Sequence, residues 1–469
     1  MKAWQMEREL MQQAVPRILS EEDQTWSAIE VIEDFDDQRI NRWWYSEVPG
    51  SGAPERLIIG AIQAMENKGY DVTEAEAWIG EGLTAWENRD LPELHRISSK
   101  ILQLLNQSKP DLSSPYWQHQ QFTSWEQAEK QMIFIPAVQV DLNSPLFEEK
   151  MKAGWLGQII GGAIGTAMEG YTTDQLKKTF GRIDQYIRTP NTFNDDITFE
   201  LAFLKAFDQK GYQITSVDIA DQWVALIPFA WSAEDIALRH LKNGVLPPVS
   251  GQMNNYFNEW IGAQMRGAIC GMAAPGNPGE AARLAWIDGC ISHHNNGIMG
   301  ELFNAMLTAT AFVEKDIHKL VQQTIESIPL TSEYGQVLRH ALEQCRSANG
   351  WEEAWAICEK KYERYNWIHA YPNAAAEVVA LWYGDGSFDK TMNVIALAGQ
   401  DVDCNAAQIG CVLAIAGGLE ALSSKWTDPI GDELNTYVRG MKQMTITGLS
   451  EWTVEAVRKA VAKSSVQEC

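Results

Sequence analysis

Long apolar runs are missing from this sequence. No stretch approaches the roughly 18 consecutive apolar residues that a membrane-spanning helix needs, and the N-terminal MKAWQMEREL lacks the apolar core of a signal peptide. We therefore expect a cytoplasmic protein with no membrane partner.

Basic side chains are scarce relative to acidic ones. The chain has 38 Lys and Arg against 62 Asp and Glu, which gives a formal net charge of −24. This balance opposes the sequence-independent attraction to phosphate on which nucleic-acid binders rely. No nucleic-acid partner is expected, and an anionic ligand would need a local positive charge such as a metal ion or a helix N-terminus.

Paired cysteines and common phosphate-binding motifs are also absent. The seven cysteines show no CxxC spacing, which favours reduced thiols over a disulfide or zinc framework. The glycine-rich stretch GWLGQIIGGAIGTAMEG (154–170) has neither the GxGxxG of dinucleotide sites nor the Gly-Lys-Ser/Thr of P-loops. Its glycines need another explanation.

Helical periodicity dominates what is present. From about residue 148, long helical patterns, including one over 255–272, alternate with short polar turns, and few stretches have the two-residue period of strands. We predict an all-α fold with one compact domain over 148–469. Residues 1–140 are predicted to form an accessory helical region of unknown role, with helices such as 91–107.

The stretch NTFNDDITFELAFLKAF (191–207) places two adjacent carboxylates at a helix start. Apolar residues recur at helical spacing, so Asn194 takes the N-cap position and Asp195 and Asp196 fall in the first turn. Acidic residues there also stabilise a helix by about 0.3–1 kcal/mol. Helix stabilisation alone is therefore an alternative to a functional site.

The glycines of 154–170 lie on one face of a predicted helix. Each costs about 0.8–1.0 kcal/mol relative to alanine, so close approach of another backbone is the simplest reason for them. Glu169 follows that face and brings a carboxylate into the crowded region.

A second acidic helix start occurs in GQDVDCNAAQIGCVLAIAGG (399–418). Asp401 and Asp403 precede a helix rich in Ala and Gly, although such a pair is also common in an ordinary polar turn. Hard divalent cations prefer several oxygen ligands. Four aspartates from two helix starts match a site for two cations, which in such sites lie about 3.5–4 Å apart.

Taken together, these three motifs resemble the ADP-ribosylglycohydrolases over residues of about 150–425. They occur in the family's order and approximate spacing, and residues 276–312 resemble its central segment. The resemblance implies an all-α catalytic domain with a binuclear Mg²⁺ site in a central cleft. It also implies hydrolysis of the bond between ADP-ribose and an acceptor, which is a protein side chain or a small molecule.

The resemblance implies roles for individual residues. The family's Thr-Asp-Asp set corresponds to residues 194–196 and its Asp-x-Asp-Thr/Ser set to residues 401–404, so one or two Mg²⁺ ions are expected there, with Ca²⁺ or Mn²⁺ as alternatives. Glu169, Asp196 and Asp403 are expected to serve catalysis, Glu169 by orienting the attacking water or as acid/base. The implied metal ligands are Asn194, Asp195, Asp196, Asp401, Asp403 and Cys404.

Two positions depart from the family's pattern. Cys404 puts a soft thiol where Mg²⁺ prefers oxygen, which favours a weakly held or missing second ion. Gly162 stands where many members have Asp. A binding protein without catalysis therefore remains an alternative, and a third hypothesis is an interaction protein that acts through residues 1–140.

The central segment contains the predicted substrate-binding residues. In SHHNNG, His293 is a candidate for lining the cleft, with a buried structural histidine as the alternative. Asn296 and Gly297 belong to a turn whose backbone N–H groups could face the diphosphate, although Asn-Gly is as readily an ordinary turn. The aromatic residues of 363–373 are candidates for stacking on adenine.

Overall fold

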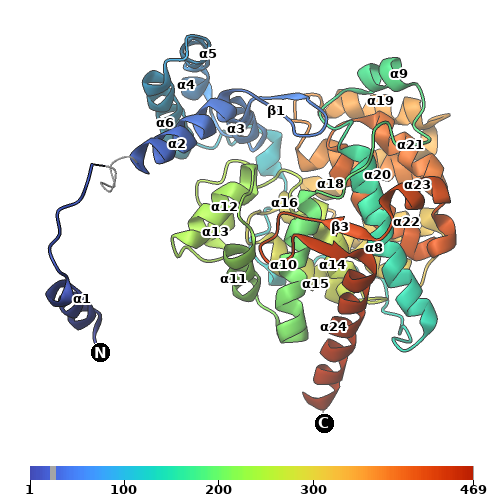
Figure 1. Ribbon diagram of the computed structural model, residues 1–469. Coiled ribbons are helices and arrows are strands. Elements are labelled where there is room, and N and C mark those ends of the chain that lie inside the picture. The colour runs from blue at the N-terminus through green and yellow to red at the C-terminus, as the bar shows by residue number, and fades with distance from the viewer. Residues whose placement is uncertain (22–27, 468–469) are drawn as a thin grey trace.

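The computed structural model describes residues 1–21 and 28–467. In this part of the chain helices predominate, and the strands form two small antiparallel hairpins, β1 with β2 and β3 with β4. The predicted all-α fold is confirmed (Figure 1). None of the described helices combines the length and apolar character needed to span a membrane.

The N-terminal part places a small group of helices beside the main body. Its elements are α1 (Ala3–Gln13), α2 (Ala28–Trp44), β1 (Ser46–Glu47), β2 (Pro54–Glu55), α3 (Leu57–Asn67), α4 (Thr73–Glu76), α5 (Ile79–Glu87), α6 (Leu91–Gln107), η2 (Pro115–Gln118) and α7 (Trp125–Glu129).

The main body begins with the long helix α8 and ends with α24. Its first half contains α8 (Pro145–Gly165), α9 (Thr173–Phe180), α10 (Asp195–Lys210), η3 (Gly211–Gln213), α11 (Ser216–Leu226), α12 (Ser232–Lys242), α13 (Val249–Gln252), η4 (Gln264–Arg266), α14 (Gly267–Ala273), α15 (Pro278–Gly289) and α16 (Asn296–Ala311). Its second half contains α17 (Ile317–Ser327), α18 (Glu333–Ser347), α19 (Trp351–Tyr362), α20 (Ala370–Gly384), α21 (Phe388–Ala398), α22 (Val402–Gly417), η5 (Leu419–Ala421), α23 (Ser424–Ile430), β3 (Glu433–Asn435), β4 (Gln443–Thr445) and α24 (Ile446–Gln467).

One predicted helix is wrong. Residues 255–272 do not form a continuous helix, because only their second half is helical, as η4 and α14. The Ile261 N–H donates to the Ile368 carbonyl, and Trp260 forms a β-bridge with His369. The backbone here therefore pairs with a distant segment instead of with its own next turn.

The glycines of α8 let two helix backbones touch. A Cβ on Gly157 would lie 2.4 Å from the Gly410 carbonyl oxygen, and one on Gly161 would lie 2.1 Å from the Ala406 carbonyl oxygen. Both contacts are with α22, so the predicted close approach is with the helix that follows the second acidic motif. The glycine face therefore fixes where the start of α22 lies.

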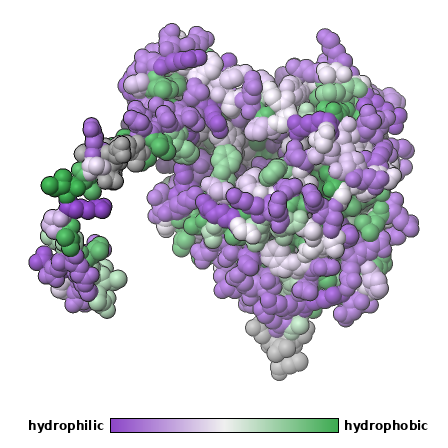
Figure 2. All heavy atoms as spheres, viewed as in Figure 1, coloured by the Kyte–Doolittle hydropathy of each residue, from purple (hydrophilic) through white to green (hydrophobic). Residues whose placement is uncertain are grey.

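The N-terminal helices pack on the main body, and one hydrophobic core runs through both. The indole of Trp260 packs on Gly60 of α3, and Lys68 donates to Asn258 Oδ1 at 3.0 Å. The helix α1 is different, because none of its residues is buried. It projects from the rest of the molecule as an arm (Figures 1 and 2).

Candidate functional site

The first acidic group lies at the start of α10. Asn194 is the N-cap, and its side-chain oxygen accepts from the Asp196 N–H at 2.7 Å. This cap fixes the first turn, so that Asp195 is half-buried and the Asp196 side chain is fully buried. The N-cap predicted from the sequence is present.

The second acidic group lies at the start of α22. Asn373 of α20 holds it through one side-chain oxygen, which accepts from the Asp401 N–H at 3.0 Å and from Asn405 Nδ2 at 2.7 Å. A Cβ on Gly165 would lie 2.3 Å from the Asp403 Cα, so α8 supports this turn directly. Asp401, Asp403 and Cys404 are all buried.

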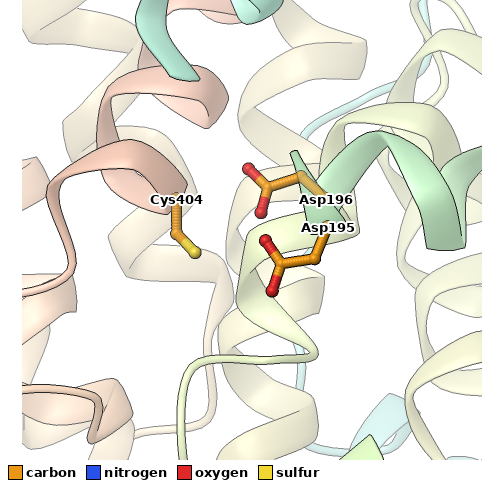
Figure 3. Close-up of side chains that lie close together, drawn as sticks. All are labelled: Asp195, Asp196 and Cys404. Carbon is orange, nitrogen blue, oxygen red and sulfur yellow. The ribbon is translucent and has the colours of Figure 1, made fainter. Parts of the chain in front are cut away.

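These two helix starts face each other across a short gap (Figure 3). Asp195, Asp196 and Cys404 offer ligand atoms that lie within 4.8 Å of one another, and so do Asp401, Asp403 and Cys404. The Asn194 amide bridges the two groups by donating to Asp403 Oδ2 at 3.4 Å. Aspartates about two hundred positions apart in the sequence therefore meet at one place.

Several carboxylate oxygens at this place have no hydrogen-bond partner. Both oxygens of Asp196, one of Asp401 and one of Asp403 are buried without a donor among the described residues. Buried anionic oxygens are costly unless a cation or hydrogen-bond donors compensate them. Oxygen ligands of this kind suit a hard divalent cation, so the residues present fit the expected metal ion.

The pKa values of these carboxyl groups also fit a bound cation. Burial and the charge of Asp403 raise the pKa of Asp195 to about 7. Burial and the neighbouring carboxylates also raise the pKa values of Asp196 and Asp401 well above the ordinary range. Without a cation the group therefore keeps protons, and a bound cation would replace them.

Glu169 lies in the turn that follows α8 and is buried beside the second acidic group. Its side chain is within hydrogen-bonding reach of Asp403. Burial, followed by the charges of Asp403 and Asp401, raises the pKa of Glu169 well above its usual value. The glutamate predicted from the glycine-rich motif is thus close to Asp403, Asp401 and Asp195.

Cys404 contributes the soft atom of the group. Its Sγ lies 3.8 Å from the Met265 sulfur. Burial, together with the charges of Asp196 and the other aspartates, raises the pKa of the thiol well above its ordinary value. At Gly162, an added Cβ would lie 2.9 Å from Asn194 Nδ2, so the missing side chain leaves room for that amide.

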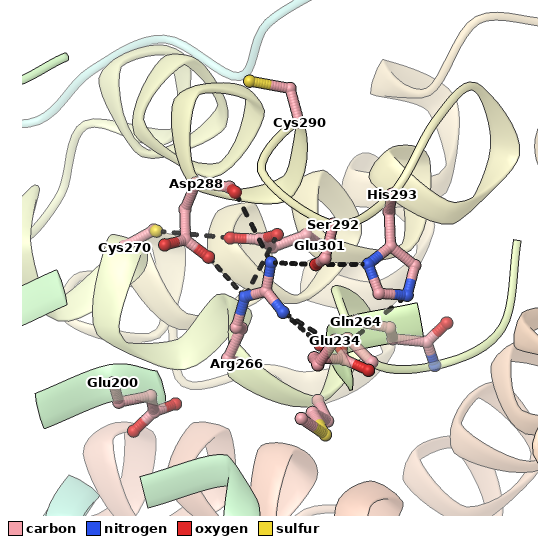
Figure 4. Close-up of polar contacts among 12 residues, drawn as sticks. Glu200, Glu234, Gln264, Arg266, Cys270, Asp288, Cys290, Ser292, His293 and Glu301 are labelled. Atoms are coloured by element: carbon pink, nitrogen blue, oxygen red, sulfur yellow. Dashed lines mark hydrogen bonds and ion pairs between the residues drawn. The ribbon is translucent and has the colours of Figure 1, made fainter. Parts of the chain in front are cut away.

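A second buried network surrounds Arg266 (Figure 4). Its guanidinium donates to Asp288 and to Glu234, the latter at 3.2 Å, and lies 3.9 Å from Glu301. Burial raises the pKa of Glu234 to about 7, and the charge of Asp195 is among the other causes. The network therefore borders the aspartate group on the α10 side.

The predicted substrate-binding residues lie outside the aspartate group. His293 is fully buried, with its Nδ1 2.8 Å from Ser292 Oγ and its Nε2 3.8 Å from Glu234, and burial keeps its pKa well below the usual value. Asn296 donates to Glu259 at 3.1 Å, and Gly297 packs on the Asn258 carbonyl. Their role in substrate binding stays a prediction.

Sequence reasoning missed three residues close to the site. Glu234 and Arg266 were not singled out, although an arginine inside the apolar stretch GAQMRGAICGMAA signals a buried ion pair. Tyr437, in the loop between β3 and β4, hydrogen-bonds with Thr198 and faces Asp195. No local pattern distinguishes this tyrosine, because its position depends on the packing of the hairpin.

Comparisons with known proteins show what the chain is similar to. The model of the family described as ADP-ribosylglycohydrolase matches residues 143–460. A solved structure described as "ADP-ribosylglycohydrolase-related protein complex" is 18% identical, covers 67% of this chain and 98% of its own, and has a TM-score of 0.49. No curated protein matches the chain.

Proposed function

The chain belongs to the ADP-ribosylglycohydrolase family, and on that premise we propose that it is a cation-dependent glycosidase that releases ADP-ribose, or a related ribosyl group, from an acceptor. The observation that carries the proposal is the meeting of two acidic helix starts around buried carboxylate oxygens that have no hydrogen-bond partner in the described part of the chain. Glu169 lies beside these carboxylates, which supports a catalytic role for the site in addition to ion binding.

The proposed ligands are the side chains of the two helix starts. A bound Mg²⁺ would supply positive charge that orients ribose hydroxyls and increases the acidity of water. Asn194 and Asn373 hold the two helix starts in place. The ligands proposed for one or two ions are Asn194, Asp195, Asp196, Asp401, Asp403 and Cys404.

Glu169 is the proposed acid/base. Cleavage of a glycosidic bond passes through an oxocarbenium-like state and needs a proton at the leaving group or a base for the attacking water. The raised pKa of Glu169 favours its protonated form, which can donate a proton to the leaving group, and makes its carboxylate a stronger base toward water. Asp403 lies beside this carboxyl, and Asp196 and Asp403 are the proposed ion ligands that serve catalysis.

A product assay tests the proposal. The protein is incubated with Mg²⁺ and ADP-ribosylated arginine, serine and small-molecule acceptors, and the products are separated by chromatography. Release of ADP-ribose is expected from at least one substrate. Glu169→Gln is expected to lower the rate by at least about 100-fold while Mg²⁺ affinity is retained. Glu451→Gln, at an exposed position of α24, is the matched control.

Ligand binding without hydrolysis is the second candidate function. The Cys404 thiol belongs to both groups of potential ligands, and a thiol matches Mg²⁺ poorly. Stoichiometric binding of ADP-ribose with no product from any substrate would favour this function. A protein that neither binds ADP-ribose nor releases it from any substrate would contradict both proposed functions.

A further inference from the structure

The hairpin of residues 46–55 contacts the turn that carries Glu169 and also Trp231, three residues before Glu234. It contains β1 and β2, in which Ser46 pairs with Glu55, and it lies outside the segment 143–460 that matches the family. In Figure 1 it extends from the N-terminal helices toward the main body. The family match therefore gives no account of it.

The tip of the hairpin packs on the turn that carries Glu169. A Cβ on Gly50 would lie 2.6 Å from the Thr166 carbonyl oxygen, so the two backbones touch. Arg188 donates to the Gly50 carbonyl, and the Tyr171 hydroxyl donates to the Ser51 carbonyl at 2.9 Å. Residues on both sides of Glu169 are thus held by the hairpin.

The turn of residues 166–171 is enclosed from two directions. Ala53 is fully buried, and its Cβ lies 2.6 Å from where a Cβ on Gly170 would be. On the opposite side the Gly170 N–H donates to the Gln400 carbonyl, next to Asp401. The turn is therefore fixed between the hairpin and the second acidic group.

The base of the hairpin reaches the other side of the site. Glu55 is buried and accepts from the Trp231 indole N–H at 3.0 Å. Trp231 lies three residues before Glu234, which faces Asp195 at the start of α10. One hairpin thus joins the Glu169 turn to the segment that borders the first acidic group.

We propose that the 46–55 hairpin is a positioning element of the active site, which fixes the Glu169 carboxyl relative to the metal ligands. This inference rests on the proposed role of Glu169. Glu169 lies beyond the last residue of α8, so helix geometry alone does not fix it. A displacement of about 1 Å at a reacting group lowers a rate by about 100-fold, so loosening this turn affects catalysis more than ion binding.

Two glycines of the hairpin provide a matched test. Gly50 (φ +118°) touches Thr166, whereas Gly52 (φ +72°) has no atom within 4 Å of an added Cβ. Both alanine variants carry backbone strain, and only Gly50→Ala displaces the turn. Gly50→Ala is expected to lower kcat by about 10–100-fold with KM and Mg²⁺ affinity within about twofold of the unmodified protein. Gly52→Ala is expected to match the unmodified protein.

Hydrogen exchange gives a readout that does not need activity. The Glu169 and Gly170 amides are protected by bonds to Gly165 and Gln400, so their exchange is expected to accelerate in Gly50→Ala and not in Gly52→Ala. Tyr171→Phe, which removes the bond to Ser51, is expected to accelerate it as well. Its control is Tyr212→Phe, because the Tyr212 hydroxyl also donates to a backbone carbonyl at 2.9 Å, that of Ala273.

The outcomes separate this inference from the proposed function. Equal exchange in Gly50→Ala and Gly52→Ala, or equal kcat in an active protein, would overturn the positioning role and leave the glycosidase proposal intact. No release of ADP-ribose by the unmodified protein would overturn the glycosidase proposal. In that case the exchange comparison still decides whether the hairpin fixes the turn.

Discussion

Asp196 combines complete burial with a carboxylate that has no hydrogen-bond partner among the described residues. Because burial raises the pKa of Asp196, folding opposes an ionisation that the unfolded chain allows, so Asp196→Asn is expected to raise the melting temperature of the metal-free protein by a few degrees. The same change is expected to remove most of the stabilisation by Mg²⁺. Calorimetry with and without Mg²⁺ measures both effects.

Asp221→Asn is the control for this substitution. Asp221 is exposed on α11, so its neutralisation is expected to leave both melting temperatures nearly unchanged. A metal-free Asp196→Asn protein that melts lower than the unmodified one, with its Mg²⁺ response retained, would contradict the ligand assignment.

We expect Cys404 to influence which ions the proposed site prefers. Replacement of its thiol by a hydroxyl supplies a harder oxygen atom at nearly the same place, so Cys404→Ser is expected to increase Mg²⁺ affinity by about tenfold. Isothermal titration measures the affinity. Cys411→Ser changes a buried cysteine of the same helix and serves as control. Unchanged Mg²⁺ affinity in the Cys404 variant would show that the side chain of residue 404 is not a ligand.

The residues of the site differ in how far sequence predicts them. Asp195 and Asp196 were predictable because capping chemistry and helical periodicity are local, and the structure has the Asn194 cap. The pairing of Arg266 with Glu234 was not predictable, because the two residues are 32 positions apart and meet only through the packing of their helices. Local pattern thus identifies a ligand set more readily than its surroundings.

The contact between α8 and α22 depends on the absence of side chains. Gly161→Ala would gain about 1 kcal/mol of helix propensity, but its Cβ would meet the α22 backbone. A net loss of about 1–3 kcal/mol in the free energy of unfolding is expected, which urea denaturation measures. Gly80→Ala in α5, where nothing lies within 4 Å, is expected to stabilise the protein. Similar effects of the two substitutions would contradict this account.

Helices were easier to predict than hairpins. The segment 91–107 matches α6, because its apolar spacing is regular and Asp90 caps it. The strands of residues 433–445 were not predicted, since three-residue strands have too few residues to show alternation. The same holds for the 46–55 hairpin, whose position depends on contacts with Thr166 and Trp231.

Across the molecule, buried carboxyl groups make the stability of the metal-free protein depend on pH. Burial raises the pKa of Glu234 and of Asp195 to about 7 and that of Glu200 and of Glu377 to about 8. In the unfolded chain these groups titrate at about pH 4. Between about pH 4 and pH 8 the folded state therefore binds more protons than the unfolded state. The free energy of unfolding must then fall as pH rises.

Urea denaturation in the presence of a chelator tests this dependence. From pH 5.5 to pH 8.5 we expect the free energy of unfolding to fall by several kcal/mol, most of it between pH 5.5 and pH 8. Mg²⁺ is expected to stabilise the protein more at pH 8 than at pH 5.5, because protons then compete less for the aspartates. A free energy of unfolding that rises over this range would contradict the raised pKa values.

We expect Gly161 and Gly165 also to limit the ionic radius that the proposed centre accepts. Because backbone meets backbone there, no rotamer change can let α8 and α22 separate, and Asp403 keeps its distance from α8. Such rigidity suits an ion with oxygen distances of about 2.0–2.1 Å, as for Mg²⁺, better than one of about 2.3–2.6 Å, as for Ca²⁺. Discrimination between small and large alkaline-earth ions would then originate in two residues that have no side chain.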